Sequence, residues 1–266
     1  MTWVPPREPH RARAVAESFG ADAERYDRAR PSYPDALVET IVTASPGRKV
    51  LDVGCGTGIA ARQFQAAGCQ VLGIDPDDRM AERSRRSGLQ VEVATFEAWN
   101  PAGRRFDLVL AAQAWHWVDQ DAGAIKAAQV LLPGGLLAVF WNAFVPPPRL
   151  TEAFAEVYRR VPTGLPFNPW ARPALEGYLT MCTKATEAIR QSGGFGVPEL
   201  RRFGWERSYT RDEWLELVPT LGGHSGIPRD KLDDLLIGIG TVIDSEGGDF
   251  AMHYATVAVT AARTKP

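Results

Sequence analysis

The feature that most constrains the fold is an alternation of short apolar segments with helical segments between residues 35 and 141. Each helical segment ends at a glycine or at a Pro-Gly pair, which are common helix stop signals. The predicted strands are 49–54, 70–75, 89–94, 106–112 and 136–141, and the predicted helices are 35–45, 59–68, 76–88 and 122–132. This alternation with short connections predicts an α/β fold with a doubly wound parallel sheet and helices on both faces. Such sheets bind ligands beside the carboxyl ends of their strands.

The pattern changes after residue 141, where proline, glycine and helical segments dominate. Strand character returns only at 200–210 and at 250–263. We therefore predict one domain over 1–266, built on a mostly parallel seven-stranded sheet. Helical lid insertions, 142–200 and 211–248, are predicted after the fifth and sixth strands, and residues 1–18 are expected to form a flexible lead-in.

The composition excludes several classes of protein. Hydrophobic residues make up 45% of the 266 residues and the formal net charge is −2, so nothing favours a nucleic acid or an anionic membrane surface as partner. No apolar run approaches the ~18 residues of a membrane span, and the basic N-terminus lacks the apolar middle of a secretory signal. The three cysteines form no CxxC pair, and no Cys/His cluster indicates a metal site. We expect a cytoplasmic protein without a metal; the oligomeric state is left open.

The strongest motif is VLDVGCGTG at residues 50–58, with Gly54, Gly56 and Gly58 in the turn after the first predicted strand. Glycines in such a turn allow positive φ and a close approach of the backbone to a ligand. A dinucleotide-binding loop needs a glycine at position 59, which is isoleucine here, and the Gly-Lys-Ser/Thr ending of a phosphate-binding P-loop is also missing. The loop therefore disfavours NAD and nucleoside triphosphates as ligands.

Two acidic residues accompany this loop. Asp52 precedes its first glycine by two residues, and Asp75 ends the second predicted strand, 21 residues after Gly54. A carboxylate at position 75 can accept hydrogen bonds from both ribose hydroxyls of an adenosine. Asp52 places negative charge beside the loop, which disfavours a pyrophosphate and favours a cationic, ammonium-bearing ligand.

With these residues the sequence resembles the class I, seven-strand S-adenosylmethionine-dependent methyltransferases. The segments DVGCGTG and GIDP match the first two motifs of that superfamily. The further segments FGADAERYDRARPSYP, AQAWHWVD and PGGLLAVFWN resemble its small-molecule branch, which includes trans-aconitate and fatty-acid carboxyl methyltransferases. The resemblance covers about residues 19–141 and continues more weakly into the last strands.

The resemblance implies a cofactor site for S-adenosyl-L-methionine, with S-adenosyl-L-homocysteine as product. The glycine loop would pass under the methionine part, Asp75 would hold the ribose, Pro76 would touch the adenine, and Arg30 would pair with the cofactor carboxylate. Many relatives have aspartate where this chain has Thr95, which offers the adenine only one neutral hydrogen bond. The full predicted set is Tyr26, Arg30, Asp52, Gly54, Cys55, Gly56, Gly58, Asp75, Pro76, Thr95, Phe96 and Ala112.

The segment AAQAWHW follows the fourth predicted strand, next to the expected position of the transferred methyl group. The resemblance favours Gln113 and His116 as the residues that meet the acceptor. His116 can serve as a base or as a hydrogen-bond donor, and of Trp115 and Trp117 one is expected to face the pocket and the other to pack. A hydroxyl acceptor needs a base, whereas a carboxylate needs only orientation.

These features predict an enzyme that transfers a methyl group from S-adenosylmethionine to a small-molecule acceptor at oxygen, either a carboxylate or a hydroxyl. The alternatives are methylation at nitrogen or carbon, and a cofactor-binding protein without catalysis. Methylation of nucleic acid is disfavoured by the net charge and by the absence of an N/D-P-P-Y/F motif after the fourth strand.

Overall fold

The computed structural model describes residues 18–264. The predicted lead-in, 1–18, lies outside the described residues except for Ser18, which begins the short 3-10 helix η2 (Ser18–Asp22). Helix α2 (Ala23–Ala29) follows directly. We call residues 18–30 the strap.

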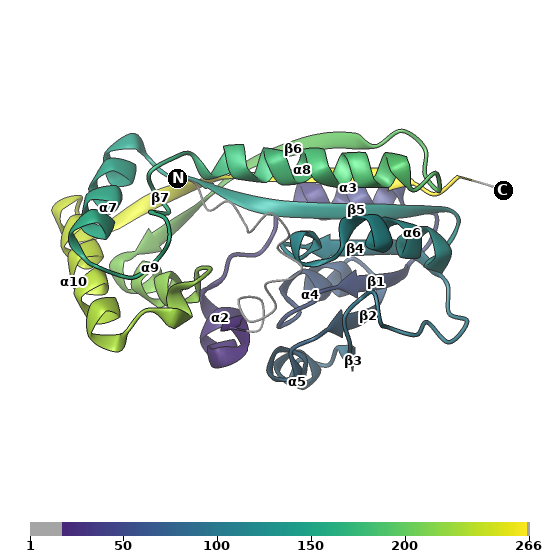
Figure 1. Cartoon of the computed structure of the whole chain (residues 1–266), viewed down its shortest axis with the longest axis horizontal. Coiled ribbons are helices and arrows are strands. Elements are labelled where there is room, and N and C mark those ends of the chain that lie inside the picture. The colour runs from purple at the N-terminus through teal and green to yellow at the C-terminus, as the bar shows by residue number, and fades with distance from the viewer. Residues whose placement is uncertain (1–17, 265–266) are drawn as a thin grey trace.

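A single seven-stranded sheet forms the centre of the molecule, as the sequence predicts (Figure 1). Its strands lie in the order β3-β2-β1-β4-β5-β7-β6, with β7 antiparallel to its neighbours β5 and β6 and the other pairs parallel. The strands are β1 (Lys49–Val53), β2 (Gln70–Asp75), β3 (Gln90–Val93), β4 (Phe106–Ala112), β5 (Leu131–Val145), β6 (Glu199–Thr210) and β7 (Asp249–Ala262). The prediction of a doubly wound, mostly parallel α/β sheet is therefore confirmed.

Helices cover both faces of the sheet because successive strand residues point to opposite sides. Val50 and Leu108 belong to the apolar core under α3 (Asp35–Ala44), α4 (Ile59–Ala66) and α5 (Asp78–Arg86). Their neighbours Leu51 and Val109 belong to the core under α6 (Gln120–Val130) and α8 (Ala174–Gln191).

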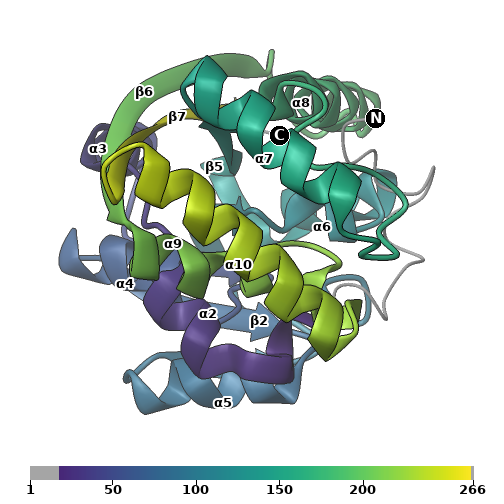
Figure 2. The same cartoon turned by 90° about the vertical axis from the view of Figure 1, so that its left-hand side faces the viewer.

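A third apolar core lies beyond one end of the sheet and forms the lid. It joins α7 (Pro148–Arg160), α9 (Arg211–Leu217) and α10 (Arg229–Ser245), with the 3-10 helices η4 (Val218–Thr220) and η5 (His224–Gly226) beside them. Figures 1 and 2 show the three helices gathered at that end, with α2 of the strap next to α9. Phe154 and Trp214 are fully buried in this core and stack with ring centroids 6.1 Å apart.

The first predicted insertion, 142–200, differs from the structure in two respects. Strand β5 runs from Leu131 to Val145 and so includes the start of that insertion; within it Gly134 has a positive φ of 79°, and the pairing with β4 shifts register between Leu131 and Leu136. Helix α8 is not part of the lid, because its small and apolar face, with Cys182 and Ala185, packs on the sheet. No helix within residues 18–264 combines the length and the apolar character needed to cross a membrane.

Candidate active site

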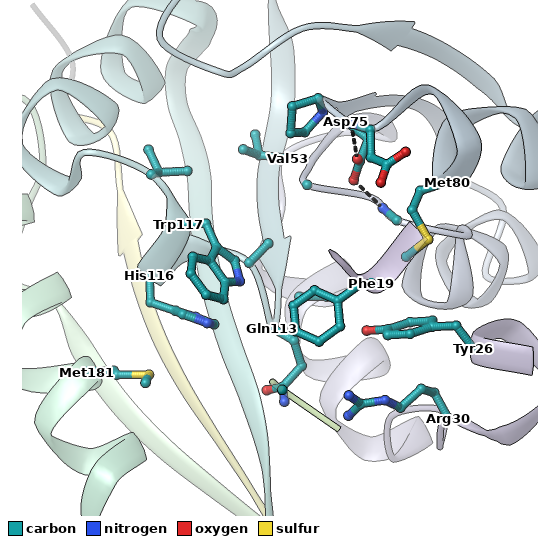
Figure 3. Close-up of a pocket in the computed structure, with 18 of the residues that line it drawn as sticks. Phe19, Tyr26, Arg30, Val53, Asp75, Met80, Gln113, His116, Trp117 and Met181 are labelled. Carbon is teal, nitrogen blue, oxygen red and sulfur yellow. Dashed lines mark hydrogen bonds between the residues drawn. The ribbon is translucent and has the colours of Figure 1, made fainter. Parts of the chain in front are cut away.

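A cavity of about 440 Å³ lies between the carboxyl ends of the central strands and the lid. The strap, the loops after β1, β2, β3 and β4, the 3-10 helix η3 (Trp115–Trp117), α8 and the segment before η5 all contribute to its wall. Figure 3 shows its interior, with Asp75 and Met80 on one side, Tyr26 and Arg30 of the strap beside them, and His116 and Met181 opposite. Its volume and mixed lining are those of a small-molecule site.

The glycine loop is held against the carboxyl ends of β1 and β2. Gly54 N–H donates to Ile74 O at 2.8 Å, and Gly56 N–H donates to Asp75 Oδ2 at 2.8 Å. Gly54, Gly56 and Gly58 all have positive φ, of 68°, 55° and 85°. A Cβ atom on Gly54 would lie 2.5 Å from the Cβ of Ala114, so the close packing of the loop on the segment after β4 requires glycine.

Gly54 and Gly56 line the cavity, whereas two other predicted loop residues do not. Gly58 is the N-cap of α4. The Cys55 side chain is buried in the core beneath the loop, where a Cβ on Gly73 would lie 2.6 Å from its Sγ. Any contact of Cys55 with a ligand is therefore limited to its backbone.

Asp75 lines the cavity with its carboxylate oriented by backbone donors. Its Oδ2 accepts from Gly56 N–H, and its Oδ1 accepts from Asp77 N–H at 2.9 Å (Figure 3). Burial raises the pKa of Asp75 to about 6, against the lowering effect of these two hydrogen bonds. Each carboxylate oxygen has a second lone pair, so the group can still accept hydrogen bonds from a vicinal diol.

Asp52 lies beneath the loop rather than in the cavity wall. It is fully buried, and within residues 18–264 neither of its carboxylate oxygens has a hydrogen-bond partner. Burial, followed by repulsion from Asp75, raises its pKa to about 8. Near pH 7 the Asp52 carboxyl is therefore mostly protonated in the ligand-free protein, and a cationic ligand beside Val53, which lines the cavity, would favour its ionised form.

The strap brings Tyr26 and Arg30 to the cavity, as predicted. The Arg30 guanidinium lies 4.9 Å from the Tyr26 ring centroid, and its Nη2 donates to Thr220 O at 2.5 Å. Arg30 Nε is buried without a hydrogen-bond partner among the described residues, so this N–H of the guanidinium group can donate to a ligand. Phe19, which the sequence motifs did not single out, also lines the cavity and packs edge-on against Tyr26, with ring centroids 5.9 Å apart.

The residues predicted for the adenine side lie together in the cavity wall. Pro76, Thr95, Phe96 and Ala112 all line the cavity. Thr95 Oγ1 accepts a long hydrogen bond, 3.4 Å, from Ala98 N–H. Phe96 is buried and belongs to the core as well as to the cavity wall. The sequence motifs did not single out four further lining residues of these segments, Val53, Met80, Ala94 and Val118.

The two tryptophans of the AWHW segment have different environments. Trp115 is fully buried in the core, whereas Trp117 lines the cavity, where Phe19 packs edge-on against its ring at 6.3 Å (Figure 3). His116 lies between them and is only 7% exposed.

The protonation of His116 follows from its contact with β5. Trp141 Nε1 donates to His116 Nδ1 at 3.1 Å, and an indole N–H can only donate, so Nδ1 carries no proton. Burial lowers the pKa of His116 to about 3, which keeps the ring neutral near pH 7. The single ring proton is therefore on Nε2.

Gln113 has a strained backbone and an amide fixed at both ends. Its φ is +57°, an unusual value for a residue other than glycine. Its Oε1 accepts from Asn142 N–H at 2.8 Å, and its Nε2 donates to Tyr178 Oη at 3.3 Å. Tyr178 lies on α8, a source of site residues that the motifs missed. The signal was present in the sequence, because the cavity-lining residues of α8 follow helical spacing: Ala174, Gly177, Tyr178 and Met181.

Comparison with known proteins agrees with this geometry. The family described as methyltransferase domain matches residues 26–180. An uncharacterized methyltransferase of Mycobacterium bovis is 38% identical over 133 residues, which cover 49% of this chain and 54% of that protein. A malonyl-[acyl-carrier protein] O-methyltransferase of Pseudescherichia vulneris is 33% identical over 156 residues, covering 56% of this chain and 61% of that protein. The chain thus matches little more than half the length of these curated relatives.

Solved structures share the fold at low sequence identity. A candidate type II methyltransferase from Anaeromyxobacter dehalogenans superimposes with a TM-score of 0.61 at 20% identity, covering 89% of this chain and 99% of that one. The phosphoethanolamine N-methyltransferase 2 of Haemonchus contortus, solved with phosphomonomethylethanolamine and S-adenosylhomocysteine, gives 0.51 at 18% identity, covering 96% and 59%. From its sheet order, its glycine loop and the match over more than half its length, the chain belongs to the methyltransferase-domain family and has the class I, Rossmann-like fold.

Proposed function

We propose that the protein is an S-adenosylmethionine-dependent methyltransferase that methylates an oxygen atom of a small molecule. The described residues fit the cofactor. Asp75 would hold the ribose hydroxyls, the glycine loop would lie against the methionine part, and the unpaired Nε of Arg30 would bind the carboxylate. When bound, S-adenosylmethionine supplies a methyl group on a positively charged sulfur, which the orphaned Asp52 carboxylate would favour.

The charges of the cavity wall are divided between two halves. The carboxylates that line it, Asp75, Asp77, Glu97 and Asp119, come from the segments after β2, β3 and η3. Among residues 18–264, the half formed by β5, α8 and the lid contributes no acidic side chain; its lining residues are Phe144, Phe167, Pro169, Trp170, Ala174, Gly177, Tyr178, Met181, Leu221, Gly222 and His224. This second half suits an acceptor with an apolar body.

The choice of oxygen as the methylated atom is supported by the protonation state of His116. A neutral imidazole with its proton on Nε2 donates to lone pairs, which an oxygen nucleophile has to spare. An amine nucleophile would instead need an acceptor for its N–H groups. In this proposal His116 orients the acceptor oxygen and removes no proton, so most of the rate gain comes from positioning and from exclusion of water.

Calorimetry and an acceptor screen test this function directly. The full chain is expected to bind S-adenosylhomocysteine and not NADH. Transfer of a labelled methyl group from S-adenosylmethionine should be seen with carboxylic acids bearing apolar bodies, which are already ionised near pH 7, and not with the corresponding amines. NADH binding without S-adenosylhomocysteine binding would overturn the proposal, and transfer to the amines alone would overturn the choice of oxygen.

Replacement of His116 by alanine should lower turnover by about 10-fold to 100-fold, the value of one donor to a charged oxygen. Affinity for S-adenosylhomocysteine should stay unchanged. Because the pKa of His116 is about 3, the wild-type rate should show no titration of this residue between pH 5 and 8. The matched control is His253→Ala, which removes an exposed histidine on β7. Unchanged turnover in His116→Ala, together with an earlier melting transition, would make the residue structural.

A further inference from the structure

Besides His224, the half of the cavity formed by β5, α8 and the lid has one polar side chain among its described lining residues, Tyr178. Its hydroxyl oxygen accepts a hydrogen bond from Gln113 Nε2 at 3.3 Å. A phenol that accepts a hydrogen bond keeps its own proton to donate. Between residues 18 and 264 no partner accepts the Tyr178 proton, although the side chain lines the cavity. Burial raises the pKa of Tyr178, so the hydroxyl stays protonated near pH 7.

The direction of the Gln113 amide is set by β5. Asn142 N–H donates to Gln113 Oε1 at 2.8 Å, which leaves the NH₂ end facing Tyr178. The backbone of Gln113 is anchored too, because its N–H donates to Phe140 O at 2.8 Å. Holding a non-glycine residue at a φ of +57° costs on the order of 1 kcal/mol, and such strain gathers at functional positions. The strained backbone at Gln113 therefore orients its side-chain NH₂ group toward the Tyr178 hydroxyl.

We propose that Tyr178 binds the methyl acceptor by donating its hydroxyl proton to a second oxygen, and that Gln113 is the positioning residue that orients Tyr178. This inference rests on the proposed methyltransferase function. His116 supplies one donor and Tyr178 another, from η3 and α8, to the same cavity. Two neutral donors match the two oxygens of a carboxylate: one oxygen is held while the other takes the methyl group. An alcohol has only one oxygen and would use only one of them.

The surroundings of Tyr178 favour a carboxylate on an apolar body. Met181 lies one turn further along α8 and also lines the cavity (Figure 3). Phe144 of β5 and Trp170 before α8 complete the apolar wall, with ring centroids 6.1 Å apart.

Calorimetry on the full chain saturated with S-adenosylhomocysteine tests the proposal. The probes are octanoate and benzoate, with octanol and benzyl alcohol as their single-oxygen counterparts. Tyr178→Phe should lower the affinity for the carboxylates by about 10-fold or more and change the affinity for the alcohols much less. Gln113→Asn tolerates the positive φ but is too short to reach Tyr178, and it should lower carboxylate affinity by a similar factor.

The double variant gives the sharpest result. If Gln113 acts through Tyr178, Tyr178→Phe with Gln113→Asn should lose no more carboxylate affinity than Tyr178→Phe alone. The control is Tyr209→Phe, which removes a buried lid hydroxyl bonded to Tyr254 and should leave all four affinities unchanged.

Three results would overturn the inference: unchanged carboxylate affinity in folded Tyr178→Phe, additive losses in the double variant, or no carboxylate binding by the wild-type protein loaded with S-adenosylhomocysteine. Failure of the wild-type protein to bind S-adenosylhomocysteine at all would instead contradict the proposed function.

Discussion

Replacement of Asp75 by alanine is expected to lower the affinity for S-adenosylhomocysteine by about 100-fold to 1,000-fold. Two hydroxyl-to-carboxylate hydrogen bonds would be lost, each worth about 1.5–3 kcal/mol, and 1.4 kcal/mol corresponds to tenfold. The variant also removes the acceptor for Gly56 N–H and Asp77 N–H, so the glycine loop loses its anchor on β2. Isothermal calorimetry measures the change.

The matched control is Asp107→Ala. Asp107 Oδ2 also accepts from a backbone donor, Lys49 N–H at 2.9 Å, but at the start of β1, away from the residues that line the cavity. Its replacement should leave the affinity for S-adenosylhomocysteine unchanged. A folded Asp75→Ala protein with wild-type affinity would contradict the ribose-binding role.

The same carboxylate makes cofactor binding depend on pH. Asp75 must be ionised to accept from both hydroxyls, and its pKa in the ligand-free protein is about 6. Affinity for S-adenosylhomocysteine should therefore fall as the pH is lowered from 7 to 5, by up to about tenfold per unit below the pKa. This fall should be absent in Asp75→Ala, whose affinity no longer depends on that proton.

Replacement of Asp52 by asparagine should stabilise the ligand-free protein at alkaline pH, because it removes a buried carboxyl group whose oxygens have no hydrogen-bond partner among the described residues. The pKa of Asp52 is raised to about 8, so between about pH 4 and pH 8 the folded protein keeps a proton that the unfolded chain has released. The free energy of unfolding of the wild-type protein therefore decreases as the pH rises through this window. Asp75, with its pKa of about 6, adds to the decrease in the lower part of the window.

The asparagine side chain of the Asp52→Asn variant carries no charge at any pH. The contribution of position 52 to the decrease in the free energy of unfolding is therefore absent in this variant. At pH 8 the ligand-free variant should be more stable than the wild type by on the order of 3 kcal/mol, or about 5–10 °C in melting temperature. At pH 4 the two proteins should melt at similar temperatures. S-adenosylmethionine, which carries the sulfonium charge, should bind the variant more weakly than it binds the wild type. A variant that melts earlier than the wild type at pH 8 would show that Asp52 has a stabilising partner.

The sheet and the cavity-lining residues near the glycine loop were predictable because they depend on local sequence patterns. Strand β1, the glycine loop and α4 follow one another within residues 49–66, so spacing alone places Gly54 and Gly56 at the carboxyl edge. Asp75 ends β2, the neighbour of β1 in the sheet, and therefore reaches the same edge. The start of β5 at Leu131 was not predictable, because its Pro-Gly-Gly segment reads as a turn, and Gly134 and Gly135 are held by backbone hydrogen bonds to the distant Arg263.

The chemistry of the acceptor side depends on contacts between distant residues. The tautomer of His116 is set by Trp141, which lies 25 positions away, and the direction of Gln113 is set by Asn142 on the same strand as Trp141. Tyr178 lies 65 positions after Gln113, on a helix whose sequence reads equally well as part of a lid. Motif spacing does not show which residues distant in the sequence contact each other. The sequence alone therefore leaves two alternatives for His116, a base and a hydrogen-bond donor.

The unequal lengths of the strands limit which parts of the protein can move when ligands enter or leave the cavity. Strands β1 to β4 have 4 to 7 residues, whereas β5, β6 and β7 have 15, 12 and 14 and continue into the lid core. Strands β5, β6 and β7 run continuously from the sheet into the lid core. The lid therefore cannot open as a rigid body about a hinge without breaking these strands. The strap contacts the two sides through side chains, such as Asp27 to Arg62 and Arg28 to Glu216, each at 2.7 Å. We therefore expect S-adenosylhomocysteine to be released when the strap dissociates from the rest of the protein. The cavity wall formed by the lid should keep the same conformation throughout the catalytic cycle.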